Sequence, residues 1–281
     1  MKRFSVAALL AVIAWMPVSA GGAGESRNGG AGSGGPAPYT ITIAGSTSVN
    51  PLMELLIAAY KKGMSHVDFS VSATGSGDGI KAVPAETAEI GMSSRELSAA
   101  EKGTGIDQTL IAVDGIAVIV NPANPLTSLS GDQIRDIYTG RITDWSQLDP
   151  GKSGAIAVVS REPGSGTRGA FEELLKFQDQ LVKGAVEFDG TGAIKAEISR
   201  NADAVGYISL GSVDGTVKAL QVEGVAATPA NVVSGTYKIA RPFLLLTKKG
   251  KALHRETRAF LDWVLSPPGQ DIVKTSWIPV K

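Results

Sequence analysis

The stretch from Ala155 to Phe171 constrains the fold more than any other part of the chain. It begins as an apolar strand, Ala155 to Val159, passes through the turn Ser160-Arg-Glu-Pro-Gly-Ser-Gly166, and continues as an amphipathic helix from Thr167. A strand that leads through a tight turn into a helix is the building unit of α/β folds. A second unit of this kind stands at Ile43-Ala-Gly-Ser-Thr-Ser-Val-Asn-Pro51. The chain is therefore expected to have an α/β fold.

The rest of the chain alternates short β-rich runs with helical periodicity. The expected strands are 39–44, 67–74, 89–92, two within 106–120, 155–160, 204–210 and 237–247. The expected helices are 51–62, a short one ending near 83, 130–138 with Ser130 as its N-cap, 167–177, 193–200 and 251–265. The run Ile116 to Val120 is continuously apolar, which is typical of a strand buried on both faces.

Two of the expected strands, 116–120 and 237–247, stand between blocks of other elements. If both cross between the blocks, the chain leaves a first lobe, builds a second and returns. We expect residues 39–117 and 240–281 to form the first lobe and residues 118–239 the second. A cleft between two such lobes is a favoured ligand site and can close by hinge motion.

The N-terminus predicts export. Residues 1–20 contain a positive start with Lys2 and Arg3, an apolar segment and the small-residue cleavage site Val18-Ser-Ala20, which together are typical of a signal peptide. An uncleaved membrane anchor is the alternative. Residues 21–38 are almost wholly Gly, Ala, Ser and Pro, a composition that favours a flexible linker.

Composition argues against several classes of function. The chain has 27 basic and 27 acidic residues, and loss of Lys2 and Arg3 with a leader would leave 25 basic ones, so nothing favours nucleic-acid binding. There is no cysteine, which excludes disulfides and cysteine metal sites. With only His66 and His254 present, a histidine-rich metal centre is not expected either. No cofactor is expected.

The two strand–turn–helix units predict a site for a small oxyanion. The start of a helix presents unpaired N–H groups and the positive end of the helix dipole. Arg161 stands just before the second helix, where its guanidinium could bind the same anion. Since the two units lie far apart in the sequence, they suggest one ligand held from two sides.

Each candidate segment also has a plainer interpretation. Gly45-Ser-Thr-Ser48 could be an ordinary N-cap, and Ser93-Ser-Arg95 a simple turn. Gly75-Ser-Gly-Asp-Gly79 lacks the spacing of dinucleotide-binding and nucleotide-hydrolase loops.

Catalysis is not expected. Ser165 is not in a G-x-S-x-G elbow, because Pro163 and Thr167 occupy the glycine positions. His254 falls in a basic helix, where we expect it at the surface. The pair Glu172-Glu173 is expected on a solvated helix face.

Taken together, these residues resemble the periplasmic phosphate-binding proteins of phosphate-specific ABC transporters, which have the two-lobed type II periplasmic binding protein fold. The resemblance extends from about Tyr39 to Lys281 and depends on five motifs in fixed order. These are Ala44-Gly-Ser-Thr-Ser-Val-Asn-Pro51, Thr74-Gly-Ser-Gly-Asp-Gly-Ile-Lys81, Ile90-Gly-Met-Ser-Ser-Arg-Glu-Leu97, Asp114-Gly-Ile-Ala-Val-Ile-Val-Asn-Pro122 and Ser160-Arg-Glu-Pro-Gly-Ser-Gly-Thr-Arg168.

The resemblance implies a phosphate site built from several loops. Its implied ligands are Thr47, Ser48, Ser76, Ser94, Arg161, Ser165, Gly166 and Thr167, with Ser46, Gly77, Arg95 and Asp114 as further candidates. Well-known relatives have an aspartate where this chain has Ser94, and that carboxylate accepts the proton of hydrogen phosphate. Here either another residue or hydroxyl lone pairs must take that place. Asp114 is our candidate for another acceptor; in the alternative interpretation, Asp114 is a hinge residue that caps backbone amides. Arg95 could add a positive contact or pair with an acid nearby.

The resemblance thus predicts a monomeric periplasmic protein, not an enzyme, that captures inorganic phosphate between two lobes and delivers it to the membrane permease of an ABC importer. Its closed form would dock on that permease. A binding protein for another tetrahedral oxyanion, such as sulfate or molybdate, is the first alternative. A secreted phosphatase and a sensing or adhesion protein are the others.

Overall fold

The computed structural model describes residues 37–280. The predicted signal peptide, 1–20, and all of the predicted linker except Ala37 and Pro38 lie outside the described residues. Within that described part, no helix has the length and apolar character needed to cross a membrane.

Within residues 37–280, nine strands form one mixed sheet in the order β2-β1-β3-β11-β4-β8-β6-β7, with β9 paired to β4. A small second sheet pairs β10 with β5. The strands are β1 (Tyr39–Gly45), β2 (Val67–Ala73), β3 (Ile90–Ser93), β4 (Ile106–Val120), β5 (Ser128–Leu129), β6 (Ala157–Arg161), β7 (Val186–Phe188), β8 (Ala204–Ser209), β9 (Lys218–Ala219), β10 (Gln221–Val222) and β11 (Ala240–Lys248).

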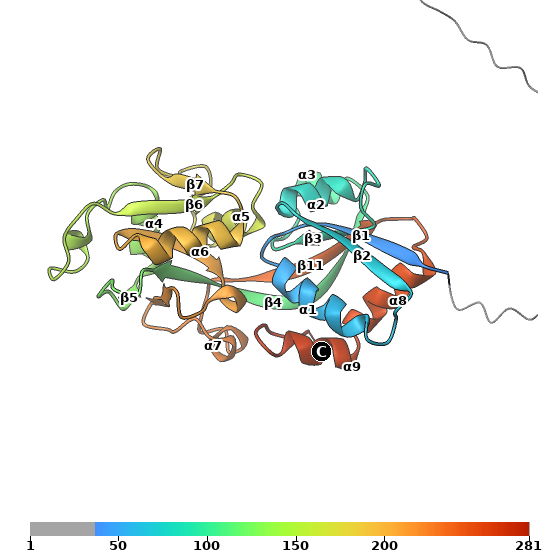
Figure 1. Ribbon diagram of the computed structural model, residues 1–281. Coiled ribbons are helices and arrows are strands. Elements are labelled where there is room, and N and C mark those ends of the chain that lie inside the picture. Colours follow the sequence, from blue (N-terminus) through green and yellow to red (C-terminus); the bar gives the residue numbers. More distant parts are fainter. Residues whose placement is uncertain (1–36, 281) are drawn as a thin grey trace, which may run out of the picture. The chain divides into compact units, whose positions relative to one another are not determined.

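Helices pack around this sheet (Figure 1). They are α1 (Asn50–Tyr60), α2 (Ser76–Ala82), α3 (Ala99–Lys102), α4 (Gly131–Tyr138), α5 (Gly166–Leu174), α6 (Gly190–Arg200), α7 (Pro229–Val233), α8 (Arg255–Val264) and α9 (Pro267–Val273). Two 3₁₀ turns, at Trp145–Gln147 and Leu210–Ser212, complete the elements.

The described residues form two lobes, as predicted, and each has its own core. In the first lobe, β1, β2 and β3 run parallel, and α1, α8 and α9 contribute to a buried cluster with Leu52, Phe243 and Phe260. In the second lobe, β6, β7 and β8 run parallel, and α4 and α5 bring Tyr138 and Phe171 into the core. The parallel strands of each lobe require crossover helices, which explains the α/β alternation in the sequence.

Two strands, β4 and β11, connect the lobes (Figure 1). The prediction of two strands within 106–120 is wrong, because β4 is one continuous strand of 15 residues. Its residues from Ile106 to Gly115 pair with β11, and those from Ile116 to Val120 pair with β8 of the second lobe. The strand therefore changes partner without ending.

The predicted helix boundaries hold to within a few residues where a cap is present. Ser130 caps α4, and its hydroxyl and the Gln133 side chain form a capping box, which confirms the predicted helix. The last main helix begins at Arg255 and not at Lys251, because the exposed His254 caps it through Nδ1.

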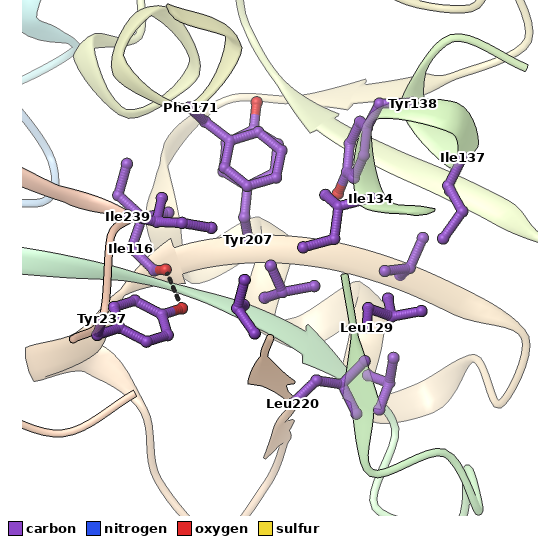
Figure 2. Close-up of a cluster of buried hydrophobic side chains, with 14 of the residues drawn as sticks. Ile116, Leu129, Ile134, Ile137, Tyr138, Phe171, Tyr207, Leu220, Tyr237 and Ile239 are labelled. Carbon is purple, nitrogen blue, oxygen red and sulfur yellow. Dashed lines mark hydrogen bonds between the residues drawn. The ribbon is translucent and has the colours of Figure 1, made fainter. Parts of the chain in front are cut away.

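The core of the second lobe contains a group of aromatic rings that includes Phe171 of α5 (Figure 2). Phe171 stacks on Tyr207 with ring centroids 4.0 Å apart and meets the edge of Tyr138 at 5.1 Å. The hydroxyl of Tyr237 donates to the Ile116 carbonyl at 2.8 Å, so this core also holds the crossing strand.

Truncation of Phe171 tests this packing. We expect Phe171→Ala to lower the free energy of unfolding by about 3–5 kcal/mol, because a buried ring is replaced by a cavity. Val233→Ala is the control: Val233 is 70% exposed, so its loss should cost less than about 0.5 kcal/mol. Urea denaturation measures both, and equal midpoints for the two variants would contradict the packing described.

Candidate functional site

The predicted site loops all follow the carboxyl ends of parallel strands. In the first lobe, residues 46–48 follow β1, Ser76 opens α2 shortly after β2, and Ser94 follows β3. In the second lobe, Arg161 ends β6 and residues 165–167 lead into α5. Ligands of open α/β sheets bind at this end of the strands. The two lobes present these ends to each other, and side chains from both meet there.

Arg161 lies at the centre of the junction and is 1% exposed. Its Nη2 donates to Thr47 Oγ1 of the first lobe at 2.9 Å. Its Nη1 approaches Thr191 Oγ1, near the start of α6, at 3.4 Å. The remaining edge of the guanidinium binds the Glu162 carboxylate, with Nε and Nη2 donating at 2.8 and 2.7 Å. One buried arginine thus contacts hydroxyls from both lobes.

Hydroxyl groups from the two lobes also contact each other directly. The hydroxyl of Ser48 in the first lobe lies 2.7 Å from that of Thr167 and 3.2 Å from that of Thr191, both in the second lobe. Nearby, the backbone N–H of Gly77 donates to the carbonyl of Gly164 at 3.0 Å. The two lobes are therefore in direct contact at this junction.

A second group of hydroxyls lies beside the first. The Ser94 N–H donates to Ser76 Oγ at 3.1 Å, and the two hydroxyl oxygens are 3.3 Å apart. Gly166, the first residue of α5, faces them across the junction. A Cβ at this glycine would lie 2.2 Å from Ser76 Oγ and 2.8 Å from Ser94 Oγ, so the close approach of the lobes requires glycine here.

The backbone that carries Arg161 is itself held by polar side chains. Its N–H donates to the Tyr207 hydroxyl at 3.3 Å, and its carbonyl accepts from Arg168 Nη1 at 2.9 Å. Burial raises the pKa of Tyr207 to about 12, so this phenol remains neutral at physiological pH. Arg168 also pairs with Glu172, which is buried, so the prediction that Glu172 lies on a solvated face is wrong.

This arrangement suits a small anion with several oxygens. Thr47, Ser48, Thr167 and Thr191 supply hydroxyls next to a buried guanidinium, and all of these side chains except the partly buried Thr47 are themselves buried. The first-turn N–H groups of α1, α5 and α6 and the positive ends of these helices add to the same potential. Among the described residues, no group of three or more His, Asp or Glu side chains is placed to hold a metal ion.

Comparisons with known proteins identify the family of this chain. The family model described as "PBP superfamily domain" matches residues 24–268. The chain is 32% identical to "Phosphate-binding protein PstS" of Bacillus subtilis, in an alignment that covers 100% of this chain and 95% of that relative. The chain belongs to the PBP superfamily. Its similarity places it among the PstS-type members of the PBP superfamily.

Two further relatives are more similar over the part compared. "Phosphate-binding protein PstS 2" of Streptococcus agalactiae is 42% identical over 137 residues, which are 45% of this chain, and the chain spans only 46% of that relative's length. A solved structure from Clostridium perfringens, of a putative phosphate ABC transporter substrate-binding protein with bound phosphate, has 44% identity and a TM-score of 0.83. That alignment covers 86% of this chain and 100% of the other.

Two of the predicted site residues have capping roles. Ser165 is the N-cap of α5, and its Oγ accepts from the Arg168 N–H at 3.3 Å. Ser46 Oγ accepts from the N–H groups of Ser48 and Val49 at 3.2 and 3.3 Å. Both side chains are buried at the junction, where they fix the two loops that carry Ser48 and Thr167.

Arg95 and Asp114 make their contacts outside the cluster around Arg161. Arg95 forms a two-fold ion pair with Glu101, with Nη1 and Nη2 at 2.7 and 2.8 Å from its carboxylate oxygens. Asp114 is fully buried and accepts from Arg241 and from the Ser209 hydroxyl. Its two oxygens are therefore engaged within the crossing strands.

Sequence reasoning missed Thr191, Glu162 and Arg241. Thr191 is the second residue of α6, within the stretch Asp189-Gly-Thr-Gly192 that follows β7 and has the same small and polar composition as the other site loops. That composition was a usable signal, but the predicted helix began at residue 193, three residues too late. No local pattern marks Arg241, since it stands within an apolar strand.

The close approach at Gly166 yields a prediction about lobe closure. We expect Gly166→Ala to hold the lobes apart, because the new methyl group overlaps Ser76 Oγ. Gly192→Ala is the matched control, since nothing lies within 4 Å of a Cβ placed there. Small-angle X-ray scattering should show a larger radius of gyration for Gly166→Ala alone. Superimposable curves for both variants and the wild type would refute the close contact.

The ion pair of Arg95 with Glu101 yields a prediction about pH. Hydrogen bonding from Arg95 lowers the pKa of Glu101 to about 2. Because this pKa is depressed on folding, the pair stabilises the protein above the ordinary glutamate value near 4.5, and that stabilisation is lost as the pH falls toward 2. At pH 7 we expect Glu101→Gln to be less stable than the wild type by up to about 1 kcal/mol.

Thermal unfolding of both proteins between pH 7 and pH 3 measures this effect. The two melting temperatures should converge as the pH falls. A gap that stays constant over this range would show that the charge of Glu101 contributes nothing.

Proposed function

We propose that this protein is an exported solute-binding protein that captures inorganic phosphate between its two lobes. The observation that carries the proposal is the buried guanidinium of Arg161, which is surrounded by hydroxyls from both lobes and lies near the starts of α1, α5 and α6. The relatives named above as phosphate-binding proteins support phosphate as the ligand.

The proposed ligand groups are Thr47, Ser48, Ser76, Ser94, Arg161, Ser165, Gly166 and Thr167, to which the structure suggests adding Thr191. Phosphate loses its water on entering such a site, and each of its oxygens then needs new hydrogen-bond donors. Hydroxyls can rotate to donate to phosphate oxygens instead of to one another, while the guanidinium supplies charge-assisted hydrogen bonds.

The proton of hydrogen phosphate needs an acceptor. The carboxylates of Glu162 and Asp114 are each held by an arginine, at Arg161 and Arg241. We propose that a hydroxyl lone pair accepts a hydrogen bond from this proton. Ser94 is the nearest candidate by its place in the loop. A hydroxyl both donates and accepts, so a site of this kind should discriminate less between phosphate and sulfate than one with a free carboxylate.

We further propose that residues 39–117 with 240–281 and residues 118–239 move as two bodies about β4 and β11 and close over the ligand. The closed protein would deliver phosphate to the membrane permease of an ABC importer, acting as a monomer in the periplasm after its leader is removed. This cycle needs no bond to be made or broken in the ligand, and hence no catalytic residue or cofactor.

Loss of Arg161 tests the proposal. We expect Arg161→Ala to weaken phosphate binding by more than about tenfold, because the charge-assisted hydrogen bonds of the site are lost. Arg95→Ala is the matched control: it removes an arginine that is also close to the loops but binds Glu101, and it should change affinity by less than about twofold. Isothermal titration calorimetry measures both.

A thermal-shift panel with phosphate, sulfate and molybdate from pH 5 to pH 9 identifies the preferred anion. Phosphate should give the largest shift. A larger shift with another oxyanion would replace phosphate as the ligand, and no shift with any of them would overturn the proposal. Metal-independent turnover of a chromogenic phosphoester would instead favour an enzyme.

A further inference from the structure

A buried ion pair lies where the two crossing strands meet. Asp114 of β4 stands directly opposite Arg241 of β11 in the antiparallel register. Arg241 Nε and Nη2 donate to Asp114 Oδ2 at 3.2 and 3.0 Å, and both side chains are almost fully buried. Replacing such a pair with apolar residues is often neutral or stabilising, so a buried pair by itself does not explain the choice of these residues.

The contacts of the pair lead in opposite directions along the molecule. On one side, Asp114 Oδ1 accepts from the hydroxyl of Ser209, the last residue of β8 in the second lobe, at 2.9 Å. On the other, Arg241 Nη1 donates to the main-chain carbonyl of Ser94 in the first lobe at 3.2 Å. The pair therefore connects the second lobe to the loop that carries one of the proposed phosphate ligands.

Ser94 is held on both sides of its own backbone. Its carbonyl accepts from Arg241, and its N–H donates to Ser76 Oγ at 3.1 Å. These two bonds fix the peptide groups that flank Ser94 and hence the direction of its Cα–Cβ bond, and its hydroxyl lies across from Gly166 of the second lobe. A lysine at position 241 could keep the ion pair with Asp114 but could not also reach the Ser94 carbonyl, because it has no planar fork.

Arg241 also lies within electrostatic reach of Arg161. Burial is the main cause that lowers the pKa of Arg241, Asp114 opposes this effect, and the charge of Arg161 adds to the lowering. Two like charges held this way in a region of low dielectric are stabilised by an anion placed near both. Arg241 is thus linked to the site by its hydrogen bond to the Ser94 carbonyl, and its charge is felt by that of Arg161.

We propose that Arg241, itself held by Asp114 and Ser209, is a positioning residue for anion binding that acts by orienting Ser94. The inference rests on the proposed function, since its effect is measured as affinity for an oxyanion. It assigns to the Asp114–Arg241 ion pair a role in recognition that is separate from its role in joining the lobes.

A double-mutant cycle between positions 241 and 94 tests the proposal. We expect Arg241→Lys to weaken phosphate binding about tenfold, as for the loss of one hydrogen bond to a charged group. In a Ser94→Ala background the same change should weaken binding by less than about twofold, because there is no hydroxyl left to orient. A merely structural role for Arg241 would give equal losses in both backgrounds.

Two further variants keep the test decisive. Arg95→Lys is the control, because Arg95 adjoins Ser94 in sequence but binds Glu101, so its small effect should be the same with and without the Ser94 hydroxyl. Ser209→Ala removes the hydroxyl that holds Asp114 and should weaken binding about threefold, again only while Ser94 is present. This milder variant replaces Arg241→Lys in the cycle if the latter does not fold.

Calorimetry with phosphate, sulfate and molybdate completes the cycle. If the wild type binds one of these anions but the losses at positions 241 and 94 are additive, the positioning role is wrong and the proposed function stands. If the wild type binds none of them, both proposals are wrong.

Discussion

The structure depends on the burial of one positive charge, that of Arg161. A guanidinium that is 1% exposed must be matched by acceptors on every side, because an unpaired buried charge is far more costly than a buried hydroxyl. Glu162 satisfies one edge, and the hydroxyls of Thr47 and Thr191 approach the others. These hydroxyls come from opposite lobes, so the hydrogen bonds required by one buried side chain hold the two lobes of the described chain together. The same buried charge favours an anion at the junction, because an anion stabilises a cation more than neutral oxygen atoms do.

Much of this architecture could be predicted from the sequence because its signals are local. An apolar run followed by a glycine-rich turn and a helical period, as at residues 155–171, specifies a strand, a turn and a helix without reference to the rest of the chain. The same holds for the Ser130 cap, whose capping box is formed by residues three apart. Since the carboxyl ends of parallel strands gather at one edge of each lobe, the predicted loops at Thr47, Ser76, Ser94 and Ser165 also come to lie at one junction.

What could not be predicted depends on partners distant in the sequence. The strand β4, Ile106 to Val120, changes its neighbour from β11 to β8. From the sequence alone, this single strand was predicted as two. Glu172 looks like a surface residue on its own helix, where its partner Arg168 is only four residues away, but Arg168 also pairs with Glu187 of β7, a contact that only the fold creates. Asp114 was weighed as a proton acceptor, but its partner Arg241 lies 127 residues away, and no pattern in either strand reveals the pair. In each case the missing information was a tertiary contact and not a local preference.

The continuity of β4 through the junction limits how the lobes can move. Where the chain crosses, β4 and β11 are paired in antiparallel register, and just before β11 begins the Ile239 carbonyl accepts from the Ile116 N–H at 2.8 Å. A two-stranded ribbon can bend or twist, but sliding one strand along the other would break every bond of the ladder and reverse the facing of its side chains. The proposed hinge motion would therefore carry the two lobes along a single arc and return them to the same alignment at each closure.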